Sequence, residues 1–115
     1  MAKRFALPAS QFRSLAMGRG SCQASDRITV DGMPVGFMYR EPPDTDIDSG
    51  WSFFCGDETD EYANNPENFE VYDVNTIANY DPLIIQYLDA PYYSAFERHP
   101  TLGKFLPTAF PEILE

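Results

Sequence analysis

Two acidic segments hold the side chains whose types and spacing could do chemistry in this chain of 115 residues. Asp44, Asp46 and Asp48 stand at alternate positions, the spacing at which an EF-hand loop offers oxygen ligands to calcium. Two other positions do not fit the EF-hand pattern. The sixth is Ser49, where the tight turn needs glycine, and the twelfth is Cys55, where a bidentate glutamate belongs. The sequence therefore favours a solvated acidic loop, and we assign no metal ligand.

The second segment contains Asp57, Glu58, Asp60 and Glu61. Crowded carboxylates raise one another's pKa, so this group could supply a general acid and base or hold magnesium. The chain shows no nucleophile paired with a base, no phosphate-binding loop and no basic substrate clamp, and we give its single histidine, His99, no role. We therefore expect no catalytic residues and no cofactor, and a protein that works by binding.

The charges are distributed unevenly along the chain. The net charge is −10, yet the first 24 residues hold four basic side chains and no acid, while fourteen carboxylates and no Lys or Arg lie between Glu41 and Glu97. Such a surface repels nucleic acid and anionic membranes, which need clustered Lys and Arg. It attracts a basic protein, although acidity that serves solubility alone remains the alternative.

Two groups of residues are candidates for contact with a partner. Aromatic residues, if exposed, would add affinity for a partner, and the candidates are Trp51, Tyr62 and Tyr72. Trp51 also fits a core position, because it is a strand residue between apolar neighbours. The sequence Tyr39-Arg40-Glu41 fits either a binding surface or, the reading we favour, a structural anchor for the acidic loops. The partner-binding candidates are Asp44, Asp46, Asp48, Trp51, Asp57, Glu58, Asp60 and Glu61.

The elements that must position these side chains are those of a small α+β domain. Residues 26–40 alternate around Asp31-Gly32, a pair suited to a type I′ turn, which predicts a β-hairpin. Residues 51–55 and 69–74 are predicted as further strands of a mostly antiparallel sheet, and residues 92–98 are the candidate for its last strand. Asp81-Pro82 is a typical helix start, and residues 75–88 are predicted as one or two short helices packed on the sheet.

The whole chain, residues 1–115, is long enough for one compact core and is expected to form a single domain. We expect residues 1–20 to form an arm or a short helix and residues 100–115 to form an irregular Pro-rich tail.

Cys22 and Cys55 lack the paired spacing of a zinc site or a redox dithiol, so we expect free thiols. Polar residues and Pro8 interrupt the apolar run that a signal peptide needs, and no apolar stretch approaches the roughly 18 residues of a membrane span. A cytoplasmic location is therefore expected.

Several blocks of the sequence occur in an order that is typical of a known family. They are SDRITVDG at 25–32, VGFMYRE at 35–41, DSGW at 48–51, GDE at 56–58, NTIANYDP at 75–82, LDAP at 88–91 and SAFER at 94–98. Together these blocks resemble the bacterial immunity protein 33 family, formerly domain of unknown function 2185, over roughly residues 19 to 99.

The resemblance implies a small α+β domain that is a presumed antidote in polymorphic toxin systems, and it brings no catalytic residues. We therefore expect an immunity-type protein that binds a toxin domain and blocks it, with the acidic residues from Asp44 to Asp73 meeting a basic patch. The alternative is a housekeeping accessory domain that binds a small ligand or a metal and has no toxin partner.

Overall fold

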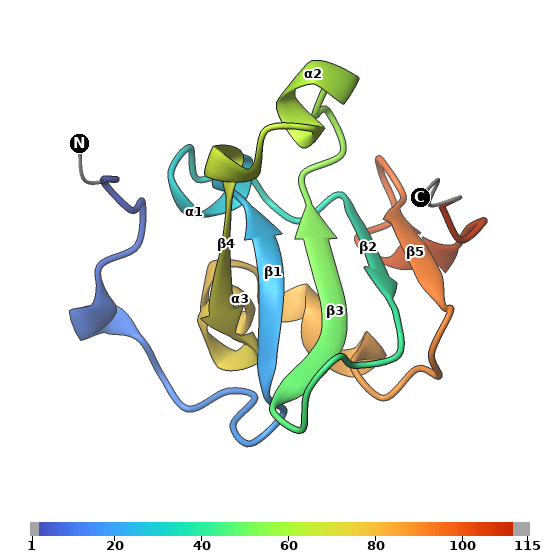
Figure 1. Cartoon of the computed structure of the whole chain (residues 1–115), viewed down its shortest axis with the longest axis horizontal. Helices are drawn as coiled ribbons and strands as arrows, with labels where there is room; N and C mark the ends of the chain where they lie inside the picture. Colours follow the sequence, from blue (N-terminus) through green and yellow to red (C-terminus); the bar gives the residue numbers. More distant parts are fainter. Residues whose placement is uncertain (1–2, 112–115) are drawn as a thin grey trace.

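A computed structural model describes residues 3–111, in which six strands form one sheet (Figure 1). Their order across the sheet is β4-β1-β3-β2-β5-β6, with β1 parallel to β3 and the other four pairs antiparallel. The mostly antiparallel α+β class predicted from the sequence is therefore confirmed. The strands are β1 (Ser21–Ser25), β2 (Phe37–Arg40), β3 (Asp48–Phe54), β4 (Phe69–Asp73), β5 (Ala95–Arg98) and β6 (Phe105–Pro107).

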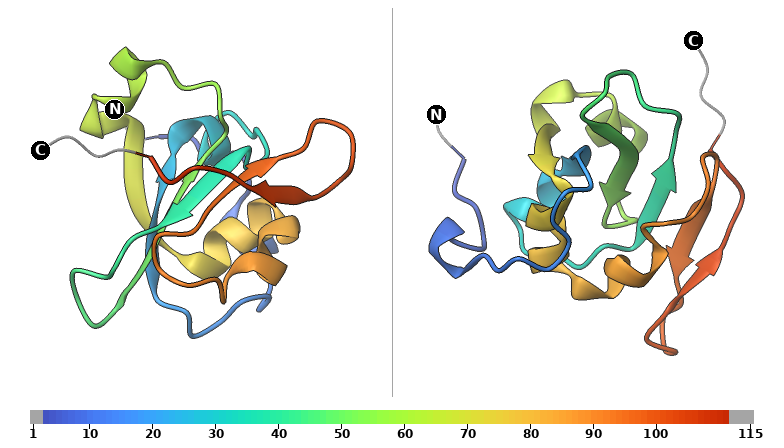
Figure 2. Two further views of the ribbon diagram at one scale, coloured as in Figure 1. Left: turned by 90° about the vertical axis from the view of Figure 1, so that its right-hand side faces the viewer. Right: turned by 90° about the horizontal axis from the view of Figure 1, so that it is seen from below.

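Two short helices, α3 (Val74–Tyr80) and the 3-10 helix η3 (Pro82–Tyr87), cover one face of this sheet (Figure 2). The carboxylate of Asp81 caps η3 by accepting a hydrogen bond from the backbone N–H of Leu83, with Pro82 at the first helical position. The helices predicted over residues 75–88 are therefore present. The Asp73 carboxylate caps α3 by accepting from the backbone N–H of Asn75.

The hydrophobic core lies between these helices and the sheet. Met38 of β2 and Phe53 of β3 are paired across the two strands, and both are fully buried. Because successive side chains of a strand point to opposite faces, their neighbours in sequence must project from the other face. The same core holds Ala24, Val74, Ile77, Ala78, Ile84 and Leu88.

The hairpin predicted over residues 26–40 is wrong. Asp26–Thr29 forms helix α1 instead, and only Phe37–Arg40 of that segment is a strand. The Ser25 hydroxyl caps α1 by accepting from the Arg27 backbone N–H. Ile28, which the alternation assigned to a strand, is fully buried from its place on this helix. Capping and core packing thus outweigh the period-two pattern.

Two strands were not predicted. β1 lies between β4 and β3 in the sheet, but its sequence of small and polar residues, Ser-Cys-Gln-Ala-Ser, has low strand propensity. β6 lies in the segment that was expected to be an irregular tail, and it pairs with β5 at the sheet edge, where Pro107 is tolerated. In the N-terminal segment, a 3-10 helix, η1, covers Ala9–Gln11.

The remaining elements mark the two ends of β3. Helix α2 (Asp60–Ala63) and the 3-10 helix η2 (Pro66–Asn68) follow the C-terminal end of β3, at the top of Figure 1. The loop of residues 41–47 precedes β3 at the opposite end. Among the helices of residues 3–111, none is long and apolar enough to cross a membrane.

Candidate functional site

The sheet face turned away from α3 and η3 carries four aromatic side chains: Phe37 and Tyr39 of β2, Phe54 of β3 and Phe69 of β4. The Tyr39 and Phe54 rings stack with their centroids 5.7 Å apart and their planes 15° apart. Phe54 also lies 6.0 Å from Phe37 and 5.6 Å from Phe69, centroid to centroid. All four side chains are only partly buried. We call these four residues the aromatic floor.

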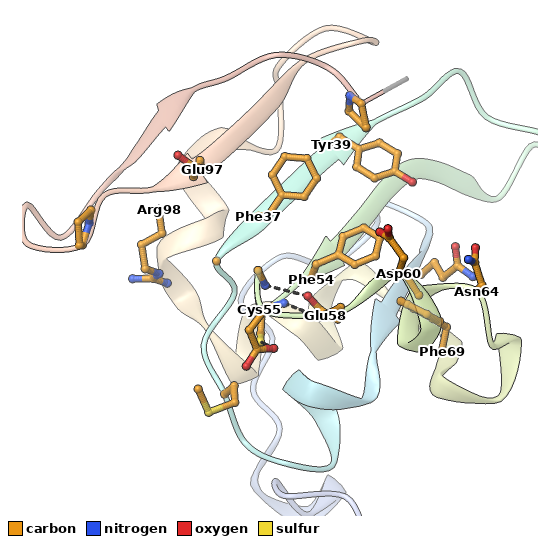
Figure 3. A pocket seen from close by; sticks show the side chains of 18 residues that line it. Phe37, Tyr39, Phe54, Cys55, Glu58, Asp60, Asn64, Phe69, Glu97 and Arg98 are labelled. Carbon is orange, nitrogen blue, oxygen red and sulfur yellow. Dashed lines mark hydrogen bonds between the residues drawn. The ribbon is translucent and has the colours of Figure 1, made fainter. Parts of the chain in front are cut away.

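A hollow of about 1050 Å³ lies over the aromatic floor (Figure 3). Pockets for small molecules measure roughly 300–1,000 Å³, so this hollow has room for several side chains of a partner. Its lining includes one guanidinium, that of Arg98, and the four carboxylates that we call the acidic rim: Asp57, Glu58, Asp60 and Glu97. The hollow thus combines an apolar floor with a negatively charged edge.

Asp57 is held by a bidentate ion pair with Arg27 of α1. The Arg27 Nε donates to Asp57 Oδ1 at 3.0 Å and Nη2 donates to Oδ2 at 2.6 Å, while Nη1 donates to Asp31 at 2.9 Å. The hydrogen bonds from Arg27, followed by that from the Cys55 thiol, lower the pKa of Asp57 to about 2. Asp57 therefore stays ionised at neutral pH and ties the turn after β3 to α1.

Glu58 and Cys55 shape the same turn. The Glu58 carboxylate accepts hydrogen bonds from the backbone N–H groups of Cys55 at 2.8 Å and of Gly56 at 2.9 Å. Burial, with the hydrogen bond to Asp57, raises the pKa of the Cys55 thiol to about 11. Each of Cys55, Asp57 and Glu58 offers one ligand atom, and these three atoms lie within 4.8 Å of one another, close enough to bind one metal ion. Arg27 already binds the Asp57 carboxylate, and backbone N–H groups already bind the Glu58 carboxylate. We therefore infer that both carboxylates stabilise the turn and do not bind a metal.

Asp60 and Glu97 are the two rim carboxylates that lack such a partner. Both are exposed, and neither forms an ion pair within residues 3–111. Glu97 is paired with Phe37 across β5 and β2, and Asp60, the first residue of α2, lines the same hollow as Tyr39 and Phe54 (Figure 3). Free carboxylates beside accessible rings can receive a positively charged group.

The other predicted acidic residues lie at the opposite end of β3. Asp44 and Asp46 are exposed in the loop before the strand, and Asp48 opens the strand. The Asp48 carboxylate accepts from the backbone N–H groups of Gly50 at 2.8 Å and of Asp44 at 3.2 Å. With a rise of about 3.3 Å per residue, the two ends of β3 are separated by on the order of 20 Å. The predicted binding residues thus form two groups, not one continuous face.

Trp51, proposed as a partner contact, is a core residue. Its side chain is only 2% exposed, its ring stacks on Phe53 at 6.0 Å, and its indole N–H donates to the Leu88 carbonyl at 3.2 Å. A side chain so enclosed cannot contact a partner unless the core opens. The alternative core placement of Trp51 is the correct one.

The three residues of the segment Tyr39-Arg40-Glu41 have different roles. The Arg40 Nε donates to the Ser49 carbonyl at 2.9 Å and Nη1 donates to the Ala90 carbonyl at 2.8 Å. The guanidinium also lies over the Tyr92 ring, 4.8 Å from its centroid. Arg40 is therefore a structural anchor, though it binds backbone carbonyls and not the carboxylates of the acidic loops. Tyr39 belongs to the aromatic floor, and the Glu41 backbone N–H bonds to the Gly50 carbonyl.

Most residues of the aromatic floor were not predicted as binding residues from the sequence. Phe37 and Phe54 alternate with the buried Met38 and Phe53, a signal that was present, but the sequence does not show which sheet face the helices cover. Of the two other aromatic candidates, Tyr62 is partly buried and lies 6.3 Å from the floor residue Phe69. Tyr72 packs against Phe5, and its hydroxyl donates to Thr29, so it lies away from the hollow.

Comparison with known proteins adds one finding to this geometry. Residues 22–108 match the family model described as immunity protein Imm33 domain, in agreement with the resemblance carried by the sequence blocks. No curated protein and no solved structure matches the chain. Because the matched segment extends from β1 to β6 and covers well over half of the 115 residues, the chain belongs to the Imm33 immunity protein domain family.

Proposed function

We propose that this protein neutralises a bacterial toxin by binding to it directly, with the hollow over the aromatic floor as the contact surface. Membership of an immunity protein family supports an immunity-type role and a protein partner. The observation that carries the binding site is the combination of four partly exposed aromatic rings with the four carboxylates of the acidic rim.

Charge supports a basic partner. The chain carries a net charge of −10, and the hollow has four carboxylates against one guanidinium, which is itself paired with Asp81. Such a field speeds the encounter with a positively charged protein, and the effect weakens as salt is added. The same field opposes binding to nucleic acid, because displacing counterions from phosphates requires Lys and Arg.

The aromatic floor supports a protein partner over a simple ion. Aromatic residues that lose their contact with water on binding contribute a large share of interface affinity, and they act within a rim that excludes water. The hollow matches this description, because it is lined by the four rings of the aromatic floor and by the four carboxylates of the acidic rim. Inhibition by binding requires no catalytic step, metal or cofactor. A reducing cytoplasm, which we propose as the site of action, suits the free thiols of Cys22 and Cys55.

The proposal is tested by capturing the partner. The tagged protein is used to pull down proteins from a lysate of the native bacterium at low and at high salt, with bound proteins identified by mass spectrometry. We expect one basic protein that is lost at high salt and whose toxicity in cells is suppressed by co-expression of this chain. Retention of no protein at either salt concentration would contradict the proposal.

The second candidate function, an accessory domain that binds a small ligand or a metal, has one observation in its favour. The Cys55, Asp57 and Glu58 ligand atoms lie close enough together to share an ion. A metal that binds only the native protein would raise the melting temperature. We therefore expect calcium, magnesium or zinc at micromolar concentration to leave the melting temperature unchanged, and a rise that is abolished by Glu58→Gln would favour this second function.

A further inference from the structure

On the basis of the proposed function, we infer that the partner inserts an arginine side chain into the hollow, where its guanidinium stacks on the Tyr39 and Phe54 rings and pairs with the Asp60 carboxylate. In this binding mode the hollow recognises the partner through an arginine side chain, and Asp60 is one of the residues that bind it.

The floor geometry favours a planar cation. Tyr39 and Phe54 are nearly parallel, with 15° between their planes, and both rings line the hollow. A guanidinium is flat, less strongly hydrated than an ammonium, and stacks on aromatic rings while its N–H groups remain free to bond in its own plane. Arg40 shows this contact within the same molecule, with its guanidinium 4.8 Å from the centroid of the Tyr92 ring.

The charges around the floor favour a cation supplied from outside. The guanidinium that contacts the acidic rim and the one that lines the hollow are already engaged. Arg27 pairs with Asp57 and Asp31, while Arg98 pairs with Asp81 and donates to the Val35 carbonyl at 2.7 Å. Asp60 therefore lines the hollow without an ion-pair partner among residues 3–111. Its exposed carboxylate is free to accept two parallel N–H bonds from an arginine.

Glu97 extends the negative charge to the β5 side of the floor. It is exposed, lines the hollow and is paired in register with Phe37. A hollow of about 1050 Å³ is much larger than one side chain, so a basic segment of several residues can lie across it with its arginine at the Asp60 end. Charge complementarity thus extends over both sides of the floor.

The inference can be tested before the partner is known. N-acetyl-arginine amide is the probe, and N-acetyl-citrulline amide, which has nearly the same shape and no charge, is its control. Both are titrated into the full-length protein, and the aromatic and backbone NMR signals are followed. We expect the arginine compound to shift the signals of Tyr39, Phe54 and Asp60, and the citrulline compound to cause much smaller shifts. Equal shifts with both compounds, or shifts confined to residues 41–47, would overturn the inference.

A matched pair of variants identifies the carboxylate. Asp60→Asn and Glu61→Gln each remove one exposed charge from the first turn of α2, but only Asp60 lines the hollow. We expect Asp60→Asn to weaken binding of the arginine probe by up to about fivefold, the range of an exposed ion pair, and Glu61→Gln to change it by less than half as much. Phe54→Leu, which keeps an apolar side chain but removes the ring, should weaken binding by a similar factor.

These results separate the inference from the proposed function. Equal effects of Asp60→Asn and Glu61→Gln would mean that only the general field attracts the probe, and the arginine site would be wrong even if a toxin is captured in the pull-down. Conversely, capture of no protein would contradict the immunity function, whereas selective shifts with the arginine probe would still establish the site. Thermal unfolding of each variant tests whether the protein remains folded.

Discussion

At the scale of single residues, the bidentate pair between Arg27 and Asp57 sets the charge state of the turn after β3. Replacing Arg27 with Gln should raise the pKa of Asp57 from about 2 towards its ordinary value of 3.8, because the hydrogen bonds that favour the ionised form are lost. A carboxyl ¹³C NMR titration measures this change. If the Asp57 pKa is the same in both proteins, the ion pair does not form in solution.

The same pair makes stability depend on pH. Because the pKa of Asp57 is lower in the folded protein than in the unfolded chain, its contribution is complete above about pH 4 and is lost as the pH falls towards 2. Urea unfolding at several pH values in this range should show a smaller loss of stability in Arg27→Gln than in the parent. A slope identical in both proteins would assign the acid sensitivity to other carboxylates.

The two thiols should differ in reactivity. Burial and the nearby Asp73 carboxylate raise the pKa of Cys22 far above its ordinary value, and its side chain is only 3% exposed. Cys55 is partly exposed, with its pKa raised to about 11 by partial burial. A disulfide reagent at pH 8 should therefore modify one thiol slowly in the native protein and the second only in denaturant. Cys55→Ala should abolish the native reaction, and a native reaction that persists would mean that Cys22 is accessible.

At the scale of secondary structure elements, Asp81 joins three segments that are far apart in sequence. Its carboxylate caps η3, accepts from the Val35 N–H at 3.0 Å and pairs with Arg98 of β5, and the residue is 8% exposed. Asp81→Ala should lower the free energy of unfolding by about 3 kcal/mol, because it leaves these donors without a partner in a largely dry site. Chemical denaturation measures this loss. The control, Asp89→Ala, removes the highly exposed partner of Arg19 and should leave stability unchanged.

The entry of the chain into β3 depends on a glycine. Gly50 has φ of +86°, and a Cβ atom there would lie 1.9 Å from the Glu41 carbonyl oxygen. Gly18 has a similar φ of +77° with no atom within 4 Å of the corresponding position. Gly18→Ala should therefore cost only the backbone strain, about 1 kcal/mol, while Gly50→Ala should cost on the order of 3 kcal/mol, since the backbone of residue 41 must move. Equal melting temperatures for the two variants would contradict this steric argument.

Elements specified by neighbouring residues were predicted more accurately than those specified by distant contacts. The η3 start at Asp81-Pro82 needs only a cap and a missing N–H, both of which are local. Asp31-Gly32 misled the prediction, because a glycine with positive φ, here +77°, closes a helix as readily as a hairpin. Strand β1 gains its place from pairing on both sides with β3 and β4, which its own sequence of small side chains does not reveal.

In the candidate site, too, local features were predicted and features that depend on distant contacts were not. Asp57, Glu58 and Asp60 were identified because carboxylates are conspicuous in any sequence, and all three line the hollow. Asp44 and Asp46 were grouped with them because the chain is short between the two segments. The seven residues of β3, however, carry these segments to opposite ends of the sheet. The floor residues could not be recognised without knowing which face α3 and η3 cover.

At the scale of the whole molecule, the separation of the acidic residues decides where a basic partner first makes contact. Asp60 and Glu61 lie in α2 beside the hollow, while Asp44 and Asp46 lie in the loop at the far end of β3. All four are exposed, so each pair can be neutralised without disturbing the core. The variants Asp60→Asn/Glu61→Gln and Asp44→Asn/Asp46→Asn have the same net charge, and they differ only in the location of the charge removed.

The association rate with the captured partner should therefore distinguish the two ends. At low salt we expect the α2 variant to associate severalfold more slowly than the parent and the loop variant to change much less, because local charge near the interface steers the encounter more strongly than distant charge. The difference should shrink at 0.5 M salt, where the screening length falls to a few ångströms. Surface plasmon resonance at both salt concentrations measures these rates. A slower rate in the loop variant would move the interface to the opposite end of β3, and equal rates would mean that only the net charge of the chain attracts its partner.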